Sequence, residues 1–380
     1  MADIAVAGRR LRFERVLTPS RAATILVPFL SILLALITCG VLLLLSGENP
    51  FEVYRAMLRG SLGDRFGVAE TLVKAIPLLL TGLGVSIAFR MQLWNIGAEG
   101  QFYLGAIAAT GTALYLFPSW PSALLIPAMM IAGLIGGAIW GFIPGVLRAY
   151  LGANETITSL MLNYVAILFA DYLVLGPWKN PQGFGFPGTK PFPDASYLPH
   201  YGTYRVHLGL LFGLVAALLL WIALRRTRWG YELSVMGENP RAARYAGMRT
   251  RQQIVVVLAL SGALAGLAGM SEVGGIAHQL QRNLSPGYGY TAIIVAWLAR
   301  LNPFGIVGVS FLLAAVLVGG DQLQLAVGLP SSVAPMLQGA ILFFLLGGEV
   351  LTRYRISLAP QSGAPPGPLS HQSSQGAGRG

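Results

Sequence analysis

Several polar side chains of this sequence lie inside or at the edges of long apolar runs, where a polar group costs free energy. Those with the most hydrogen-bonding capacity are Asn95, Glu99, Gln101, Asn163 and Tyr164. Amide and carboxylate groups can bind the hydroxyl groups of a polar solute, and polar residues within membrane segments are often functional. We therefore expect these five residues to line a solute pathway. Packing and helix capping are the competing interpretation, and Asn95, near one end of its segment, could instead belong to a gate.

Motifs for catalysis and metal binding are incomplete in this chain. No lysine follows a glycine, so a phosphate-binding loop of the Walker A type is absent. The four histidines lack the spacing of metal ligands. Residues 259–262 (ALSG) resemble the Gly-x-Ser-Gly of rhomboid-type proteases, and residues 318–321 (VGGD) resemble the Gly-x-Gly-Asp of aspartyl intramembrane proteases, but each lacks its first glycine. We expect no enzyme activity, no metal site and no cofactor on this chain.

The composition indicates that lipid surrounds most of the chain. Of its 380 residues, 54% are hydrophobic and 11% are charged, and the mean hydropathy is +0.64. A soluble domain carries about 25% charged residues. Residues 22–46 form an uncharged run that is long enough to cross a hydrocarbon core of about 30 Å and too long for a typical signal peptide. The single cysteine, Cys39, excludes an intrachain disulfide.

Ten apolar segments have the character of membrane-spanning helices. They are residues 22–46, 73–89, 97–117, 122–147, 157–176, 207–224, 253–272, 286–300, 304–320 and 332–349. The expected fold class is therefore all-α, a polytopic bundle of about ten transmembrane helices. Glycines recur every fourth residue from Gly133 to Gly145 and again at Gly262 and Gly266. Such spacing lets helices approach closely in lipid, so we expect these glycines to be packing contacts.

The distribution of basic residues predicts the orientation of the bundle. With the N-terminus in the cytoplasm, cytoplasmic segments hold roughly twice as many lysines and arginines as the outer segments, as the positive-inside rule requires. Both termini are then cytoplasmic, and the net charge of +11 needs no nucleic-acid partner. The chain divides into an N-terminal tail (1–21), a membrane domain (22–355) and a low-complexity C-terminal tail (356–380) that we expect to be disordered.

The largest cytoplasmic loop, residues 225–252, contains the signals of a short helix. In GENPRAARYAG (237–247), Asn239 can cap the start, Pro240 suits the first helical position and Gly247 suits the C-terminal cap. The predicted helix, 240–246, is about 10 Å long and too short to be stable alone in water. We expect it to dock on another protein; a helix lying on lipid headgroups is the alternative. The residues expected to contribute are Glu238, Asn239, Arg241, Ala242, Ala243, Arg244 and Gly247.

Three stretches resemble permease subunits of prokaryotic ABC importers. GENPRAARYAGM, followed by an apolar run with SGALAGLAG, is similar to the loop that couples such permeases to their ATPase. LWNIGAEGQFYLGA (93–106) resembles the N-I-G-x-E-G-Q signature of the sugar and nucleoside branch, which is related to ribose permeases. GANETITSLMLNYVA (152–166) resembles a segment of its nucleoside-type members. The three stretches occur in order over about residues 93–275, which makes the combination specific.

This resemblance implies a membrane-spanning permease subunit of an ATP-driven importer in a prokaryotic plasma membrane. The expected solute is a small polar molecule, a nucleoside or a simple sugar, and a branched-chain amino acid is the alternative within the same class of importer. The resemblance also implies a separate ATPase subunit that binds ATP and Mg and docks on helix 240–246, a second and different permease subunit, and an outer substrate-binding lipoprotein. The alternative is a stand-alone carrier or channel driven by an ion gradient, with Glu99 and Glu272 as its ion or proton sites.

Overall fold

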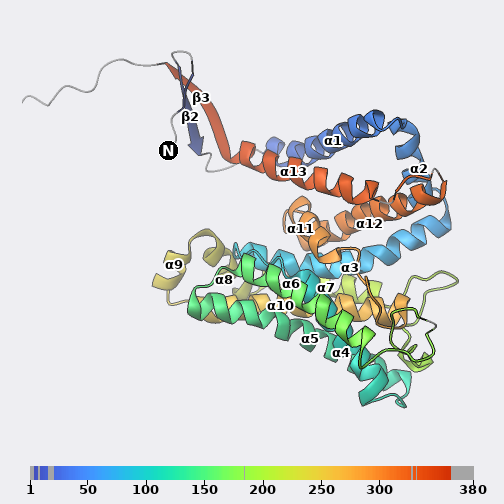
Figure 1. Ribbon diagram of the computed structural model, residues 1–380. Helices are drawn as coiled ribbons and strands as arrows, with labels where there is room; N and C mark the ends of the chain where they lie inside the picture. The colour runs from blue at the N-terminus through green and yellow to red at the C-terminus, as the bar shows by residue number, and fades with distance from the viewer. Residues whose placement is uncertain are drawn as a thin grey trace, which may run out of the picture.

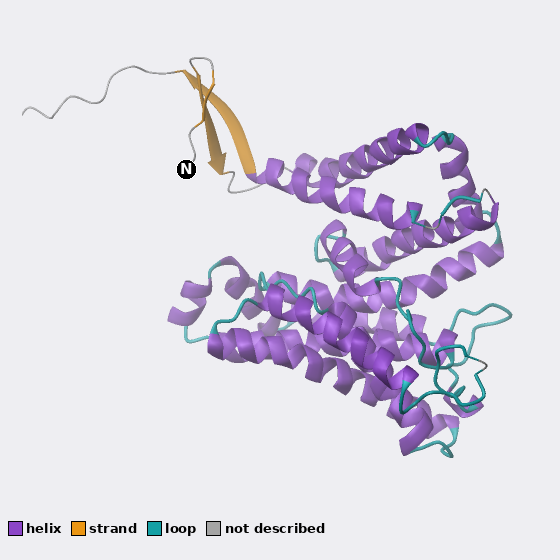
Figure 2. Cartoon of the chain, viewed as in Figure 1, coloured by secondary structure: helices purple, strands orange, loops and turns teal. Residues whose placement is uncertain are grey.

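A computed structural model describes residues 4–6, 9–15, 21–183, 185–326, 328–330 and 332–360 of the chain. Most of this part is helical (Figures 1 and 2), as the long apolar segments predict. The helices are α1 (Arg21–Leu45), α2 (Pro50–Leu62), α3 (Arg65–Arg90), α4 (Ala98–Gly111), α5 (Ser122–Leu151), α6 (Glu155–Leu175), α7 (Gly209–Arg226), α8 (Arg228–Glu238), α9 (Pro240–Tyr245), α10 (Thr250–Glu272), α11 (Tyr288–Leu298), α12 (Pro303–Ala326) and α13 (Val333–Arg353). Single π-helical turns, Thr112–Leu116 and Val273–Ala277, extend α4 and α10.

Seven helices of the described part are long and apolar enough to cross a membrane: α1, α3, α5, α6, α7, α10 and α12. Each of the ten segments expected from the sequence contains a helix, but the segment 286–300 holds only the 11 residues of α11. A helix of that length spans about 16 Å, so the expectation that this segment crosses the membrane alone is wrong. The helix stops early because Arg300 and Leu301 take left-handed backbone conformations. The seven candidates do not confirm the expected total of ten spans.

The helix α3 runs through the centre of the bundle and is the most buried of the seven, with 89% of its most apolar window inside the chain. It begins at Arg65, eight residues before the expected start. Asp64 explains the earlier start, because its side chain caps the helix by accepting a hydrogen bond of 2.6 Å from the backbone N–H of Gly67. The amphipathic helix α2, which precedes it, was not among the expected elements.

Helices α5 and α10 pack against each other through glycines, as the recurrence of glycine at every fourth residue predicts. A methyl group added to Gly137 would lie 2.1 Å from the carbonyl oxygen of Gly262, and one added to Gly266 would lie 2.2 Å from that of Gly133. Distances this short leave room for hydrogen only, so the two backbones are in direct contact. The packing interpretation of these glycines is confirmed.

A small antiparallel sheet joins the two ends of the chain. Its strands are β1 (Ile4–Val6), β2 (Arg9–Arg15) and β3 (Tyr354–Pro360), with Arg9 opposite Pro360 and Arg15 opposite Tyr354. The expectation of disorder from residue 356 is therefore wrong for residues 356–360, where Ile356 and Leu358 alternate with other residues in a strand-like pattern. Residues 361–380 lie outside the described residues. The sheet brings both ends of the chain to the same side of the bundle as α9 (Figure 1).

Candidate functional site

The N-terminus of α9 has the cap that its sequence predicts. The side-chain oxygen of Asn239 accepts hydrogen bonds from the backbone N–H groups of Arg241 and Ala242, each 3.1 Å long. Pro240 occupies the first helical position, where its missing N–H costs nothing. These contacts satisfy donors that so short a helix would otherwise leave to water.

The C-terminus of α9 closes in a Schellman motif. The backbone N–H of Gly247 donates to the carbonyl oxygen of Arg244, and that of Met248 donates to the carbonyl oxygen of Ala243, both at 3.0 Å. Gly247 has φ +76°, a left-handed conformation that glycine adopts without strain. The predicted helix over 240–246 is confirmed to within one residue, since α9 ends at Tyr245.

The side chains around α9 divide into an exposed face and one inward contact. Arg241, Ala242, Arg244 and Tyr245 are exposed, and Tyr245 has 93% of its surface free. Ala243 is fully buried, because it faces the body of the chain. The expectation that Ala243 offers a docking contact therefore needs correction. Two more of the expected residues, Glu238 and Gly247, flank α9 and are exposed.

The preceding helix, α8, fixes α9 to the bundle. The indole N–H of Trp229 donates to the side-chain oxygen of Gln253 at 2.9 Å, and the amide of Gln253 reaches Glu232 at 3.3 Å, which ties α8 to α10. At its other end, α8 touches α3 so closely that a methyl group on Gly237 would lie 2.0 Å from the carbonyl oxygen of Arg90. Short contacts therefore connect α8, which leads into α9, to two membrane helices.

Four of the five polar residues expected to line a pathway meet where the chain is unwound between α3 and α4. The amide of Asn95 donates to Gln101 at 3.0 Å and to the hydroxyl of Ser261 on α10 at 2.8 Å. All three side chains are buried. Because each polar group has a partner, the cluster holds the unwound segment in place without an unsatisfied group in an apolar environment.

Asn163 of α6 and Glu99 of α4 continue this cluster. Asn163 accepts from the N–H of Gly100 at 2.8 Å and donates to the carbonyl of Ile96 at 2.8 Å and to the hydroxyl of Tyr290 at 3.3 Å. Glu99 accepts from the N–H of Gly289 at 2.7 Å. The fifth expected residue, Tyr164, is 56% exposed and lies apart from these contacts. No motif indicates the partners Ser261, Gly289 and Tyr290, which are distant in the sequence.

The serine and the aspartate of the two protease-like stretches have hydrogen-bond and ion-pair partners that are not those of a protease site. Ser261 accepts the hydrogen bond from Asn95. Asp321 forms an ion pair with Lys74 of α3. Within the described ranges, no group of three or more His, Cys, Asp or Glu side chains could hold a metal ion.

Comparison with known proteins gives the class of the chain. Residues 67–346 match the family described as "Branched-chain amino acid transport system / permease component". The chain belongs to this family: it is a membrane permease subunit of an ABC importer for a small polar solute, and a multi-pass protein of the plasma membrane. This assignment favours the importer over the stand-alone carrier.

Three proteins to which the chain is similar are ABC transporter permease proteins. The chain is 36% identical to the glucose ABC transporter permease protein TsgB13 of Haloferax volcanii over 343 residues, which cover 87% of this chain and 90% of the relative. It is 33% identical to the guanosine ABC transporter permease protein NupP of Bacillus subtilis, over 86% of this chain and 94% of the relative. NupQ, a second guanosine permease protein of the same organism, is 26% identical over 64% of this chain and 78% of NupQ.

Proposed function

We propose that the chain imports nucleosides and is coupled to its ATPase subunit through α9. The observation that carries the coupling role is the combination at α9: a helix of six residues with both ends capped, an exposed face of arginine and tyrosine, and a rigid connection to α3 and α10. Within the described part of the chain, the exposed face of this helix makes no contact that the bundle itself needs. It suits a groove on a partner that pushes or pulls it.

The mechanism follows from differential binding. When ATP closes the ATPase pair, the docked α9 helices move with it, and α8 passes the movement to α3 and α10. Because α3 is central and leads into the unwound segment at Asn95, its displacement changes the path beside α4 and α6. Nucleotide shifts the balance between inward-open and outward-open states only by the difference in its affinity for them.

A second, different permease subunit completes the pathway in this proposal. Two different relatives in Bacillus subtilis, NupP and NupQ, are each called a guanosine ABC transporter permease protein, which supports two unlike subunits. Among the five polar residues, Tyr164 is the one with a largely exposed ring, so it is the candidate for direct contact with a flat base. The wall of the pathway is then supported by four buried residues that do not contact the solute: Asn95, Glu99, Gln101 and Asn163. An outer substrate-binding lipoprotein delivers the solute.

Uptake by cells tests the solute. Cells lacking this gene, and the same cells carrying it on a plasmid, are given labelled guanosine or labelled glucose. The proposal predicts that guanosine uptake requires the gene and that excess unlabelled adenosine or cytidine competes. Loss of glucose uptake with normal guanosine uptake would contradict the nucleoside assignment and favour the sugar assignment, which the relative TsgB13 suggests.

A further inference from the structure

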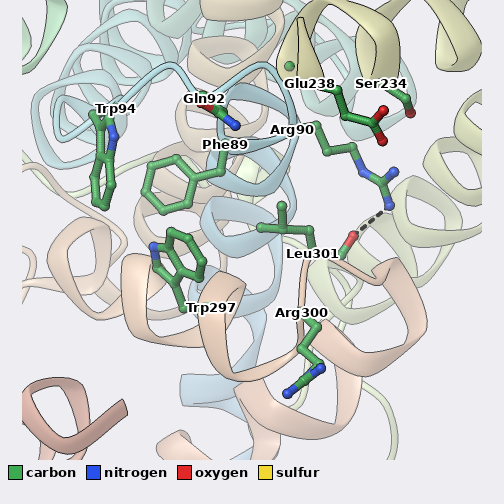
Figure 3. Close-up of a pocket in the computed structure, with 10 residues that line it drawn as sticks. Phe89, Arg90, Gln92, Trp94, Ser234, Glu238, Trp297, Arg300 and Leu301 are labelled. Carbon is green, nitrogen blue, oxygen red and sulfur yellow. Dashed lines mark hydrogen bonds between the residues drawn. The ribbon is translucent and has the colours of Figure 1, made fainter. Parts of the chain in front are cut away.

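A cavity of about 400 Å³ lies beside the start of α9, between the C-terminal ends of α3, α8 and α11. Figure 3 shows its lining: aromatic rings from Phe89, Trp94 and Trp297 line one part, and Arg90 and Glu238 lie together at another. Its volume is within the range of small-molecule sites, about 300–1,000 Å³. None of the residues proposed for the solute pathway lines it.

The aromatic part of the lining is a compact cluster. The ring centroids of Phe89 and Trp94 are 5.2 Å apart, those of Phe89 and Trp297 are 5.7 Å apart, and those of Trp94 and Trp297 are 5.9 Å apart. Trp94 is 40% exposed although it is a large aromatic residue. An exposed tryptophan in a concave site offers a face on which a flat ring can stack.

Two buried hydrogen-bond donors of this cavity have no partner among the residues that the structure describes. They are the Nε of Arg90 and the indole Nε1 of Trp297. Arg90 uses one of its terminal nitrogens to donate to the carbonyl oxygen of Leu301 at 2.9 Å, which fixes the guanidinium in place. A buried donor without an acceptor costs free energy, so an anionic or carbonyl oxygen supplied by a ligand would be stabilised here.

The backbone around the cavity is also strained. Gln92, Arg300 and Leu301 have φ values of 56°, 52° and 56°, which side chains other than glycine rarely adopt. All three residues line the cavity. Strain of this kind costs free energy and is typical of sites whose geometry serves binding.

We propose that this cavity binds a planar aromatic ligand that carries one anionic group, of the class of a nucleoside monophosphate. The ring stacks on the exposed face of Trp94, a carbonyl oxygen of the ligand accepts from the indole N–H of Trp297, and the anionic oxygens accept from the Nε–H of Arg90. Glu238 accepts from an amino or hydroxyl group of the ligand. Because Glu238 ends α8 and the other walls belong to α3 and α11, an occupied cavity clamps the segment that leads into α9. That last consequence rests on the proposed coupling role of α9, whereas the binding does not.

Binding to the purified full-length chain in lipid nanodiscs tests the proposal without ATPase or transport. Guanosine 5′-monophosphate, guanosine and inorganic phosphate are titrated separately by calorimetry. The monophosphate is expected to bind in the micromolar range, and each of the two fragments about tenfold or more weaker, since each lacks half of the contacts. Equal binding of the monophosphate and of inorganic phosphate would overturn the proposal.

Three variants locate the site. Arg90→Gln removes the charge, Trp297→Phe removes the orphaned N–H but keeps the ring, and Trp94→Leu removes the exposed stacking face. Each should weaken the monophosphate by about fivefold or more, and Trp120→Phe, on a distant loop, should not. Trp94→Leu keeps the test decisive if Arg90→Gln fails to fold, because Trp94 is partly exposed. Wild-type affinity in the folded variants would refute the site.

Nanodiscs of neutral and of anionic lipid distinguish a lipid headgroup from a soluble ligand. Full displacement of the monophosphate by anionic lipid would assign the cavity to lipid and overturn the proposal.

Discussion

The carboxylate of Glu99 and the backbone N–H of Gly289 form a buried hydrogen bond of 2.7 Å that joins α4 to α11. The contact is possible only because Gly289 has no side chain: a methyl group there would lie 2.2 Å from the backbone nitrogen of Glu99. Since α11 is too short to cross the membrane alone, this bond is one of the contacts that fix its start. Because the carboxylate has this hydrogen-bond partner, it can be buried inside the bundle.

Two substitutions of Glu99 test whether its hydrogen bond to Gly289 stabilises the folded chain. Glu99→Gln keeps an acceptor for the N–H of Gly289 and should leave the folded chain close to wild type. Glu99→Ala leaves that N–H unsatisfied and opens a cavity, and should destabilise the chain by about 2–4 kcal/mol. Thermal unfolding of both variants in the same detergent measures the difference. Equal stability of the two variants would mean that the bond does not hold α11.

The glycine contact between α5 and α10 predicts a strong effect of a single methyl group. Gly137→Ala and Gly262→Ala should each destabilise the bundle by about 1–3 kcal/mol or prevent folding, because the opposing backbone cannot retreat. Gly308→Ala is the matched control, since Gly308 lies in helix α12 with open space around it. The fraction of chain that elutes as a monodisperse peak reports the effect. Control and test variants that behave alike would contradict the packing.

The cap of α9 can be weakened without touching its exposed face. Asn239→Ala removes the acceptor for Arg241 and Ala242 and should cost about 1 kcal/mol of helix stability, whereas Asn239→Ser keeps it. Hydrogen exchange of the α9 amides should then be faster in the alanine variant alone. Uptake should fall in parallel if a formed α9 is needed for coupling. Unchanged exchange in Asn239→Ala would show that packing, and not the cap, maintains α9.

A histidine of the loop between α6 and α7 predicts sensitivity to acid. Burial lowers the pKa of His207 to about 3, with smaller contributions from His200, His278 and Arg205. The ordinary value is about 6.5, so between these two values the opened loop binds a proton that the folded loop does not. Stability is therefore complete above about pH 6.5 and falls below it, by about 1.4 kcal/mol at pH 5.5.

The matched variant for this prediction is His207→Asn. Its side-chain oxygen can replace Nδ1 as the acceptor for the N–H of Gly209, a bond of 3.2 Å, but it does not titrate. Hydrogen exchange over residues 189–209 at pH 7.5 and 5.5 should show acid-induced opening in the wild type and little change in the variant. The same pH response in both chains would assign the effect to another group.

Features set by neighbouring residues were predictable from the sequence. The α9 helix could be placed to within a residue because Asn239, Pro240 and Gly247 determine its ends through local hydrogen bonds and backbone conformation. The glycine packing was predictable because spacing along a helix fixes which residues share a face. The membrane helices followed from hydropathy, since lipid demands long apolar runs.

Features set by distant residues were not predictable. The burial of Ala243 depends on how α9 rests on the bundle, which a capping pattern does not contain. The partners of Asn95 and Glu99 are Ser261 and Gly289, each more than 150 residues away. The cavity beside α9 collects side chains from three segments, 89–94, 234–238 and 297–301, and no pattern in any one of them indicates it.

The most direct test of the coupling role is the accessibility of Tyr245. Cys39 is the only cysteine, so Cys39→Ala gives a chain to which Tyr245→Cys, or Tyr201→Cys on the outer loop as a control, is added. A membrane-impermeant maleimide should label position 245 only in inverted vesicles and position 201 only in right-side-out vesicles, and the ATPase subunit of the native transporter should block labelling at 245 alone. Labelling of position 245 from outside, or labelling that the assembled ATPase leaves unchanged, would contradict the account.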